Sequence, residues 1–181
     1  MNRAITILSG GQSGVDRGAL DAALELGNPC GGWCPRGREA EDGPIPPRYP
    51  LHEADGGYAE RTRRNVAESD GTLILHRGPL GEGSLLTLQL CRELGKPVCL
   101  VEAGTSSPAA AAAAALAFIE AQGIGRLNVA GPRRSQWTYA YHYAHDAVHE
   151  LISLLWNDEQ TGQAAESTVT GGGGAPRSLQ S

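Results

Sequence analysis

The chain has 181 residues, a length that fits one domain of α/β size, and about half of them are apolar or glycine, as in ordinary globular proteins. No apolar run is long enough to span a membrane. The formal net charge of −5, from 15 basic and 20 acidic side chains, has the wrong sign for a protein that mainly binds nucleic acid. Composition therefore favours a globular protein without a membrane or nucleic-acid partner.

The cysteines and the start of the chain bear on location. The few residues before the first apolar run do not form a secretory signal, so we expect a cytoplasmic protein. In that compartment the four cysteines are not expected to form disulfides, and their spacing does not predict a structural zinc site.

Strand-like and helical patterns alternate along the chain. The predicted strands cover residues 4–9, 30–34, 72–76, 98–101 and 127–130. The predicted helices cover residues 15–27, 83–95, 107–123 and 137–156, with a further helical segment around 61–65. Short apolar strands separated by helices predict an α/β fold, a Rossmann-like three-layer sandwich with a mainly parallel five-stranded sheet and helices on both faces.

Two regions interrupt this alternation. Residues 35–60 contain five prolines and little periodicity, and so long a loop in a small domain is usually functional. From residue 158 the composition becomes polar and then glycine-rich. We expect one ligand-binding domain over residues 1–157 and a disordered tail over residues 158–181.

Three glycine-containing loops follow the first, third and fifth predicted strands, at residues 9–14, 78–84 and 131–135. Parallel strands place such loops at one edge of the sheet, where the helix that follows each loop offers N–H groups to an anion. If the first and third loops share one crevice, the strand order is 2-1-3-4-5. The first loop lacks the lysine of a Walker loop and does not fit G-x-G-x-x-G, and a tight strand-to-helix turn explains it equally well.

Several segments together resemble the putative molybdenum carrier family. They are SGGQSGVDR at residues 9–17, GGWCPRG at 31–37, AEDGPIP at 40–46, YPL at 49–51, RT at 61–62, NV at 65–66, SDGTLI at 69–74 and LNVAGPR at 127–133. The resemblance covers about residues 4–155. That family is similar to a Rossmann-like superfamily that includes molybdenum cofactor carrier proteins and lysine-decarboxylase-like nucleotide phosphoribohydrolases. The resemblance implies a phosphorylated, pterin- or nucleotide-like ligand at the carboxyl-terminal rim of the sheet, with molybdenum cofactor as a candidate cargo.

The loops and the resemblance together predict the residues that bind this ligand. The phosphate-side loop comprises Gly10, Gly11, Gln12, Ser13 and Gly14. The other predicted residues are Asp16, Arg17, Trp33, Cys34, Pro35, Asp42, Gly43, Arg61, Asn65, Gly81, Gly83, Ser84, Thr87, Gly131, Pro132 and Arg133. Simpler roles stay open for several of them, because Asp16 also suits the α-helix dipole, Trp33 also suits a core, and Arg61 also suits a solvated helix face.

The chemistry of the site is less determined than its position. The phosphoribohydrolases carry P-G-G-x-G-T-x-x-E, whose glutamate is catalytic, and here Thr87 stands in its place. We therefore expect binding without catalysis and assign no catalytic residue. The alternatives are a nucleotide-derived hydrolase that uses Asp42, Asp70 or Glu82, and a ligand-sensing regulatory module; a homo-oligomer also stays open. His142, His145 and His149 share one helix side, but a solvated face is favoured over a metal site.

Overall fold

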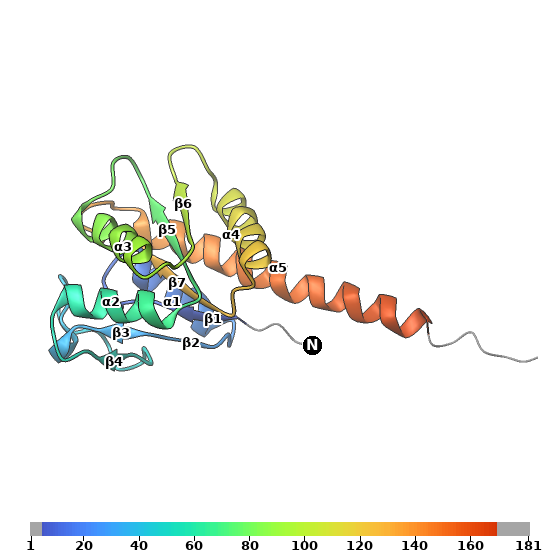
Figure 1. Cartoon of the computed structure of the whole chain (residues 1–181), viewed down its shortest axis with the longest axis horizontal. Coiled ribbons are helices and arrows are strands. Elements are labelled where there is room, and N and C mark those ends of the chain that lie inside the picture. The colour runs from blue at the N-terminus through green and yellow to red at the C-terminus, as the bar shows by residue number, and fades with distance from the viewer. Residues whose placement is uncertain (1–4, 170–181) are drawn as a thin grey trace, which may run out of the picture.

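The computed structural model describes residues 5–169, and their side chains as far as residue 157. A parallel five-stranded sheet carries helices on both faces, which confirms the predicted α/β, Rossmann-like class (Figure 1). The strands are β1 (Thr6–Leu8), β2 (Cys30–Gly31), β3 (Trp33–Cys34), β4 (His52–Glu53), β5 (Gly71–His76), β6 (Val98–Glu102) and β7 (Arg126–Ala130). The helices are α1 (Val15–Glu25), the 3-10 turn η1 (Arg36–Arg38), α2 (Tyr58–Glu68), α3 (Glu82–Glu93), α4 (Pro108–Gln122) and α5 (Ala140–Val169).

The order of the strands differs from the prediction. The sheet runs β2-β1-β7-β5-β6, so the last strand of the chain lies between the first and third predicted strands, and the expected order 2-1-3-4-5 is wrong. The middle residues of β7, from Leu127 to Val129, are buried, as a central strand requires. Leu100 on β6 is 42% exposed, as on an edge strand. Every strand in this sheet runs parallel, so the three loops still meet at one rim.

The predicted strand at residues 30–34 is two strands. Gly32, with a φ of 129°, breaks it, and a Cβ there would overlap the backbone oxygen of Ser9. Beyond the break, β3 leaves the main sheet and pairs with β4 in a separate two-stranded sheet. The predicted loop at residues 35–60 is therefore less irregular than expected, since it contains η1, β4 and the first turn of α2.

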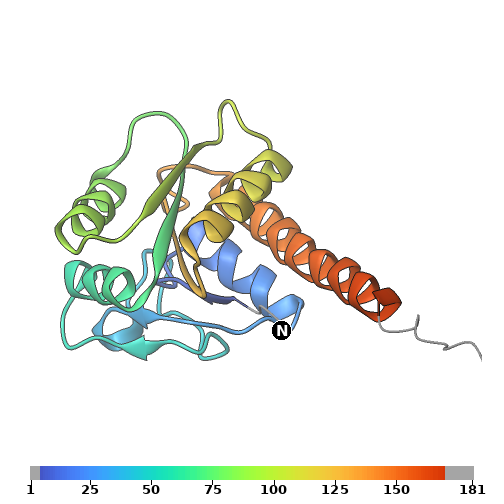
Figure 2. The ribbon, with the colours of Figure 1, turned by 45° about the vertical axis from the view of Figure 1, so that its right-hand side comes forward.

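The helices form two layers (Figure 2). Helices α1, α4 and α5 pack on one face of the sheet around the largest apolar core, whereas α2 and α3 cover the other face with a smaller core. Helix α4 begins and ends as its sequence predicts, because the hydroxyl of Ser107 accepts the N–H of Ala110 and Gly123 closes the helix with a φ of 67°.

Helix α5 extends away from the body of the domain (Figure 1). It runs as far as Val169, past the predicted start of the tail at residue 158, and residues 170–181 lie outside the described residues. The division of the chain at residue 157 stays a prediction. No described helix is both long enough and apolar enough to cross a membrane.

Candidate functional site

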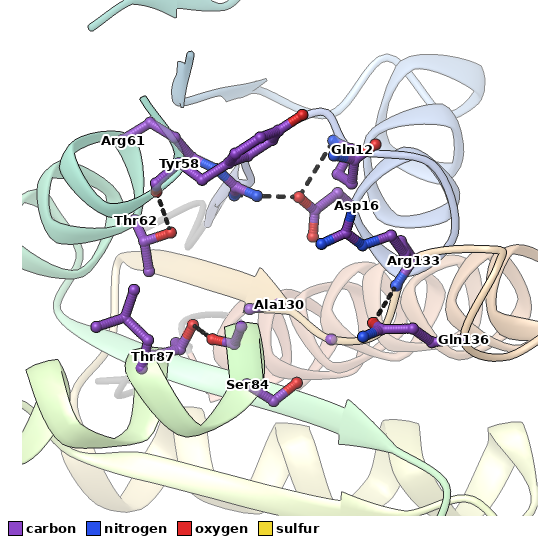
Figure 3. A pocket seen from close by; sticks show the side chains of 13 residues that line it. Gln12, Asp16, Tyr58, Arg61, Thr62, Ser84, Thr87, Ala130, Arg133 and Gln136 are labelled. Carbon is purple, nitrogen blue, oxygen red and sulfur yellow. Dashed lines mark hydrogen bonds and ion pairs between the residues drawn. The ribbon is translucent and has the colours of Figure 1, made fainter. Parts of the chain in front are cut away.

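A cavity of about 90 Å³, here called the rim cavity, lies at the carboxyl-terminal edge of the sheet (Figure 3). It is bounded by the loop after β1, the starts of α2 and α3, and the loop after β7. Its lining residues are Gln12, Asp16, Tyr58, Arg61, Thr62, Gly83, Ser84, Leu86, Thr87, Ala130, Gly131, Arg133 and Gln136. The position is the one at which parallel α/β sheets bind ligands.

The first turn of α3 opens into the rim cavity. Gly81 is the N-cap residue and no side chain of the described chain caps this helix, so the first N–H groups are free to meet an anion. Gly83 and Ser84 line the cavity, and a Cβ at Gly83 would meet nothing within 4 Å. The Thr87 hydroxyl donates to the backbone oxygen of Gly83 at 2.9 Å, so it is occupied within the helix.

Two arginines bring positive charge to the rim cavity. Arg61 reaches from α2 to Asp16 at the start of α1, with its Nη1 atom 3.2 Å from Asp16 Oδ2 (Figure 3). Within the described side chains, the Arg61 Nε atom is buried without a hydrogen-bond partner. Arg133 comes from the loop after β7, and its guanidinium lies 6.0 Å from the centre of the Tyr58 ring. A cation from each side and the helix N-terminus make the cavity suited to an anion.

Asp16 is the only carboxylate among the residues that line the rim cavity. It is 3% exposed, and burial raises the pKa of this carboxyl against the opposing effects of Arg61 and of the hydrogen bond from the Gln12 N–H. The Oδ2 atom of Asp16 accepts the Gln12 N–H and pairs with the Arg61 guanidinium. Asp16 therefore links α1 both to α2 and to the loop that precedes α1.

The first turn of α1, unlike that of α3, is filled by the protein itself. The backbone oxygen of Pro132 accepts the N–H of Val15 at 3.2 Å, and the oxygen of Gln12 accepts the N–H of Arg17 at the same distance. Gly14 has a φ of 84°, and a Cβ there would lie 2.5 Å from the Pro132 oxygen. Residues 10–14 therefore form a close turn against the loop after β7, and they leave this helix end little room for a phosphate.

The segment after η1 folds over that turn. Arg38 organises the segment, because its guanidinium donates to four backbone oxygens, those of Ile45, Pro46, Tyr49 and Leu51. Arg17 of α1 forms a salt bridge with Asp42, with Nη2 and Oδ1 2.8 Å apart. Glu41 accepts hydrogen bonds from Ser13 and Ser135. The long loop is thus tied to the loops after β1 and β7 by polar contacts.

A second cavity of about 540 Å³, here called the side cavity, lies on the other side of the same turn. Its lining residues are Ser13, Gly14, Arg17, Asp21, Asp42, Pro46, Arg48, Tyr49, Arg134, Thr138, Tyr139, Tyr141 and His142. Asp21 accepts hydrogen bonds from Arg48 and from the hydroxyl of Tyr141, at 3.1 and 2.7 Å, and burial raises the pKa of Tyr141.

The predicted site residues therefore separate into three groups. Those that line the rim cavity are Gln12, Asp16, Arg61, Gly83, Ser84, Thr87, Gly131 and Arg133. Those that line the side cavity are Ser13, Gly14, Arg17 and Asp42. Those found in neither lining are Gly10, Gly11, Trp33, Cys34, Pro35, Gly43, Asn65, Gly81 and Pro132. Sequence reasoning missed Tyr58, Thr62, Leu86, Ala130 and Gln136, of which Tyr58, an aromatic residue directly after Gly56 and Gly57, carried the clearest signal.

Trp33 lies away from the rim cavity. Its ring packs against the Arg64 guanidinium at 4.5 Å and against His52 at 5.4 Å. The buried Asn65 side chain accepts the Trp33 N–H at 2.8 Å and donates to the Trp33 oxygen at 2.9 Å, so it fastens α2 to β3. Cys34 is fully buried in the core beneath, and burial raises the pKa of its thiol.

The three carboxylates suggested for a hydrolase also lie elsewhere. Asp42 faces the side cavity and is paired with Arg17. Asp70 accepts the N–H groups of Gly125 and Arg126 at the opposite edge of the sheet, where β5 and β7 begin. Glu82 is in the first turn of α3 but does not line the rim cavity.

Of the three histidines of α5, His145 contacts carboxylates, whereas His142 lies edge-on to the Tyr141 ring and His149 stacks on His145. His145 hydrogen-bonds to Glu25 at 2.8 Å and to Asp146 at 3.2 Å; burial lowers the pKa of His145, but these two carboxylates outweigh burial and hold it above its ordinary value. Within the side chains that the structure describes, no group of three or more His, Cys, Asp or Glu residues could hold a metal ion.

Comparison with known proteins agrees with this architecture. A model of the circularly permutated YpsA SLOG family matches residues 7–152. A crystal structure of a putative molybdenum carrier protein from Syntrophus aciditrophicus SB shares 39% sequence identity, with a TM-score of 0.79, over 82% of this chain and 95% of that one. No curated protein matches the chain. On the family match and this identity, the chain belongs to the circularly permutated YpsA SLOG family.

Proposed function

We propose that the chain binds a phosphorylated, nucleotide- or pterin-like small molecule, with one phosphate at the first turn of α3. The observation that carries the proposal is the uncapped start of this helix, which opens into the rim cavity beside Arg61 and Arg133. Free N–H groups, the positive end of the helix dipole and two guanidinium groups all favour an anion.

The organic part of the ligand would lie at the mouth of the rim cavity. A cavity of about 90 Å³ is smaller than the roughly 300–1,000 Å³ of ordinary ligand pockets, so it suits a phosphate group better than a whole nucleotide. Tyr58 is 40% exposed at this mouth and offers a flat surface to a planar ring. Tyr58 replaces Trp33 as the residue that we expect to stack on the ligand.

Molybdenum cofactor is one ligand of this class. The related protein from Syntrophus aciditrophicus SB is named a putative molybdenum carrier protein, and the phosphate of a pterin cofactor would suit the start of α3. The described side chains include no metal-binding cluster, so the protein would recognise the organic part and carry the metal as cargo.

We propose binding without turnover. Cleavage of a glycosidic or phosphoester bond needs a carboxylate placed for proton transfer, which contributes about 10²–10⁴-fold. Among the residues that line the rim cavity, Asp16 alone is a carboxylate, and it is engaged with Gln12 and Arg61. Multiple turnover of a nucleoside monophosphate by the unmodified protein would overturn this part of the proposal.

The variant Gly83→Glu tests the position of the phosphate. A side chain at residue 83 meets open space, and a carboxylate in the first turn suits the helix dipole, so the fold should remain intact. The same carboxylate repels a bound anion. We expect AMP and inorganic phosphate to raise the melting temperature of the unmodified protein, and the Kd of each to rise by at least about tenfold in Gly83→Glu.

Ala109→Glu is the matched control. Ala109 is an exposed residue in the first turn of α4, on the opposite face of the sheet, and its replacement adds the same charge to the start of another helix. It should leave the Kd for phosphate unchanged. Equal binding by Gly83→Glu and Ala109→Glu would place the anion elsewhere.

A further inference from the structure

The carboxylate of Glu41 is surrounded by donors from two loops of the sheet rim. Its Oε1 atom accepts the hydroxyl of Ser13 and, at 3.1 Å, the N–H of Ser135. Its Oε2 atom accepts the hydroxyl of Ser135 at 2.5 Å and lies 3.9 Å from Nε of Arg133. We call Ser13, Ser135 and Arg133 the donor cluster.

The donor cluster is built as an anion site. Ser13 follows β1 and the other two residues follow β7, so the donors belong to the edge at which the rim cavity lies. The Arg134 N–H donates to the hydroxyl oxygen of Ser13 at 3.2 Å. The hydroxyl therefore accepts from Arg134 and donates its own hydrogen to Glu41. Two hydroxyls, one backbone N–H and a guanidinium are the partners that phosphate and carboxylate oxygens share.

The donor cluster lowers the pKa of the Glu41 carboxyl. Burial on its own would raise the pKa of the carboxyl, but the hydrogen bonds from Ser13 and Ser135 outweigh it and hold the pKa below the ordinary value. The donors thus favour a full negative charge at this position.

Glu41 itself lies on a segment that polar contacts hold more than apolar burial does. None of residues 36–44 is buried, and Glu41 lies between Gly37 and Gly43, whose φ angles are 75° and 108°. The Arg17–Asp42 salt bridge, the hydrogen bond from the Glu41 N–H to Gln12 and the hydrogen bonds that Arg38 donates hold it in place, and the partly buried Ala40 is its contact with an apolar core. Lifting this segment would cost polar contacts at the surface and little apolar burial.

We propose that the donor cluster is a second anion subsite, which Glu41 occupies in this structure and yields to a phosphate or carboxylate of the ligand. The subsite adjoins the rim cavity, because Arg133 lines the cavity and also pairs with Glu41, and Gln12 lines it and accepts the Glu41 N–H. The ligand class is accordingly a compound with two anionic groups, one for each site. This ligand class rests on the proposed function, whereas the subsite itself does not.

Removing Glu41 tests the subsite with inorganic phosphate as the probe. In the Gly83→Glu background, which blocks the α3 site, Glu41→Ala should lower the Kd for phosphate by at least about tenfold, because the tethered competitor is gone. Glu39→Ala in the same background removes an equal charge from an exposed position two residues away and should change the Kd by less than about twofold. Adding Ser135→Ala to the Glu41→Ala chain should abolish the gain.

The outcomes separate the two proposals. Unchanged phosphate binding in Glu41→Ala, or a gain shared by Glu39→Ala, overturns the subsite and leaves the α3 site standing. If Gly83→Glu does not weaken phosphate binding, the α3 site falls, and the subsite is then judged by Glu41→Ala against Glu39→Ala in the unmodified background. A merely structural role for Glu41 predicts lower thermal stability with no gain in phosphate affinity, which also overturns the subsite.

Discussion

The loop before α1 and the loop before α3 look alike in sequence and differ in structure. Both are rich in glycine, both follow a parallel strand, and both precede a helix whose N-cap residue is a glycine without a side-chain cap. The first helix end is filled by backbone oxygens of Gln12 and Pro132, whereas the second opens into the rim cavity. Glycine in the first loop serves close packing, and in the second it leaves the start of the helix open to the rim cavity.

If the loop before α1 (residues 9–14, here called the closed loop) could be loosened at little cost in free energy, the two helix ends would not differ as described, and the buried pair Asp16–Arg61 tests this. Replacing Arg61 with Met leaves the Asp16 carboxylate buried without its cation, and such a change costs about 3–5 kcal/mol. We expect this loss in the free energy of unfolding at pH 7, measured by urea denaturation. The loss should shrink on acidification, because burial raises the pKa of Asp16 and protonation removes the unpaired charge.

Arg63→Met is the control for that prediction. Arg63 lies on the same helix, is half-exposed, and faces the half-exposed Glu93 at 3.9 Å, so its loss should cost less than about 1 kcal/mol. Similar losses for Arg61→Met and Arg63→Met would show that the closed loop does not depend on the buried pair.

Replacing one glycine with alanine in each loop measures how differently the two helix ends are packed. Gly14→Ala requires a backbone conformation that alanine avoids and brings a Cβ to 2.5 Å from the Pro132 oxygen, so it should cost roughly 2–4 kcal/mol. Gly83→Ala places a methyl group in open space within a helix and should stabilise the fold by up to about 1 kcal/mol. Thermal unfolding of the two variants should therefore move in opposite directions, and a shared direction would remove the distinction.

The sequence predicts where the loops gather but not which of them is open. Parallel strands place Gly10–Gly14 and Gly81–Ser84 at one edge whatever the strand order, so the wrong order did not change which loops gather at this edge. Whether a helix end is free depends on Pro132, a residue 118 positions from Gly14 in the chain that reaches it because β7 lies beside β1. No local pattern encodes that contact.

Two further differences have the same origin. Trp33 stands near the end of the second predicted strand, which suggested a place beside the ligand, but Gly32 redirects the chain into a second sheet, away from the rim cavity. Glu41 lies in a stretch without periodicity, and its partners Ser13 and Ser135 are distant in sequence. Hydrophobic periodicity reports the faces of helices and strands, and it carries no information about polar contacts between loops.

The smallest expected effect concerns how pH changes the stability of the closed loop and of the Glu41 segment that covers it. Asp16 and Glu41 respond to acid with opposite signs. The pKa of Asp16 is raised above 3.8 by burial, so its protonation on acidification favours the folded state. The pKa of Glu41 is lowered below 4.5, where hydrogen bonds from Ser13 and Ser135 outweigh burial. Its contribution is therefore present above pH 4.5 and is lost as the pH falls through the lowered value.

Glu41→Gln isolates the second effect, because Asp16 titrates in both chains and cancels in their difference. The unmodified protein should be more stable than Glu41→Gln by up to about 1 kcal/mol at pH 6, a small value because the contacts lie at the surface. From pH 4.5 downward the difference should diminish as Glu41 takes up a proton, and urea denaturation at pH 6, 4.5 and 3.5 measures it. A difference that grows on acidification would mean that Glu41 is stabilised as the neutral acid, and the donors around it would then not favour an anion.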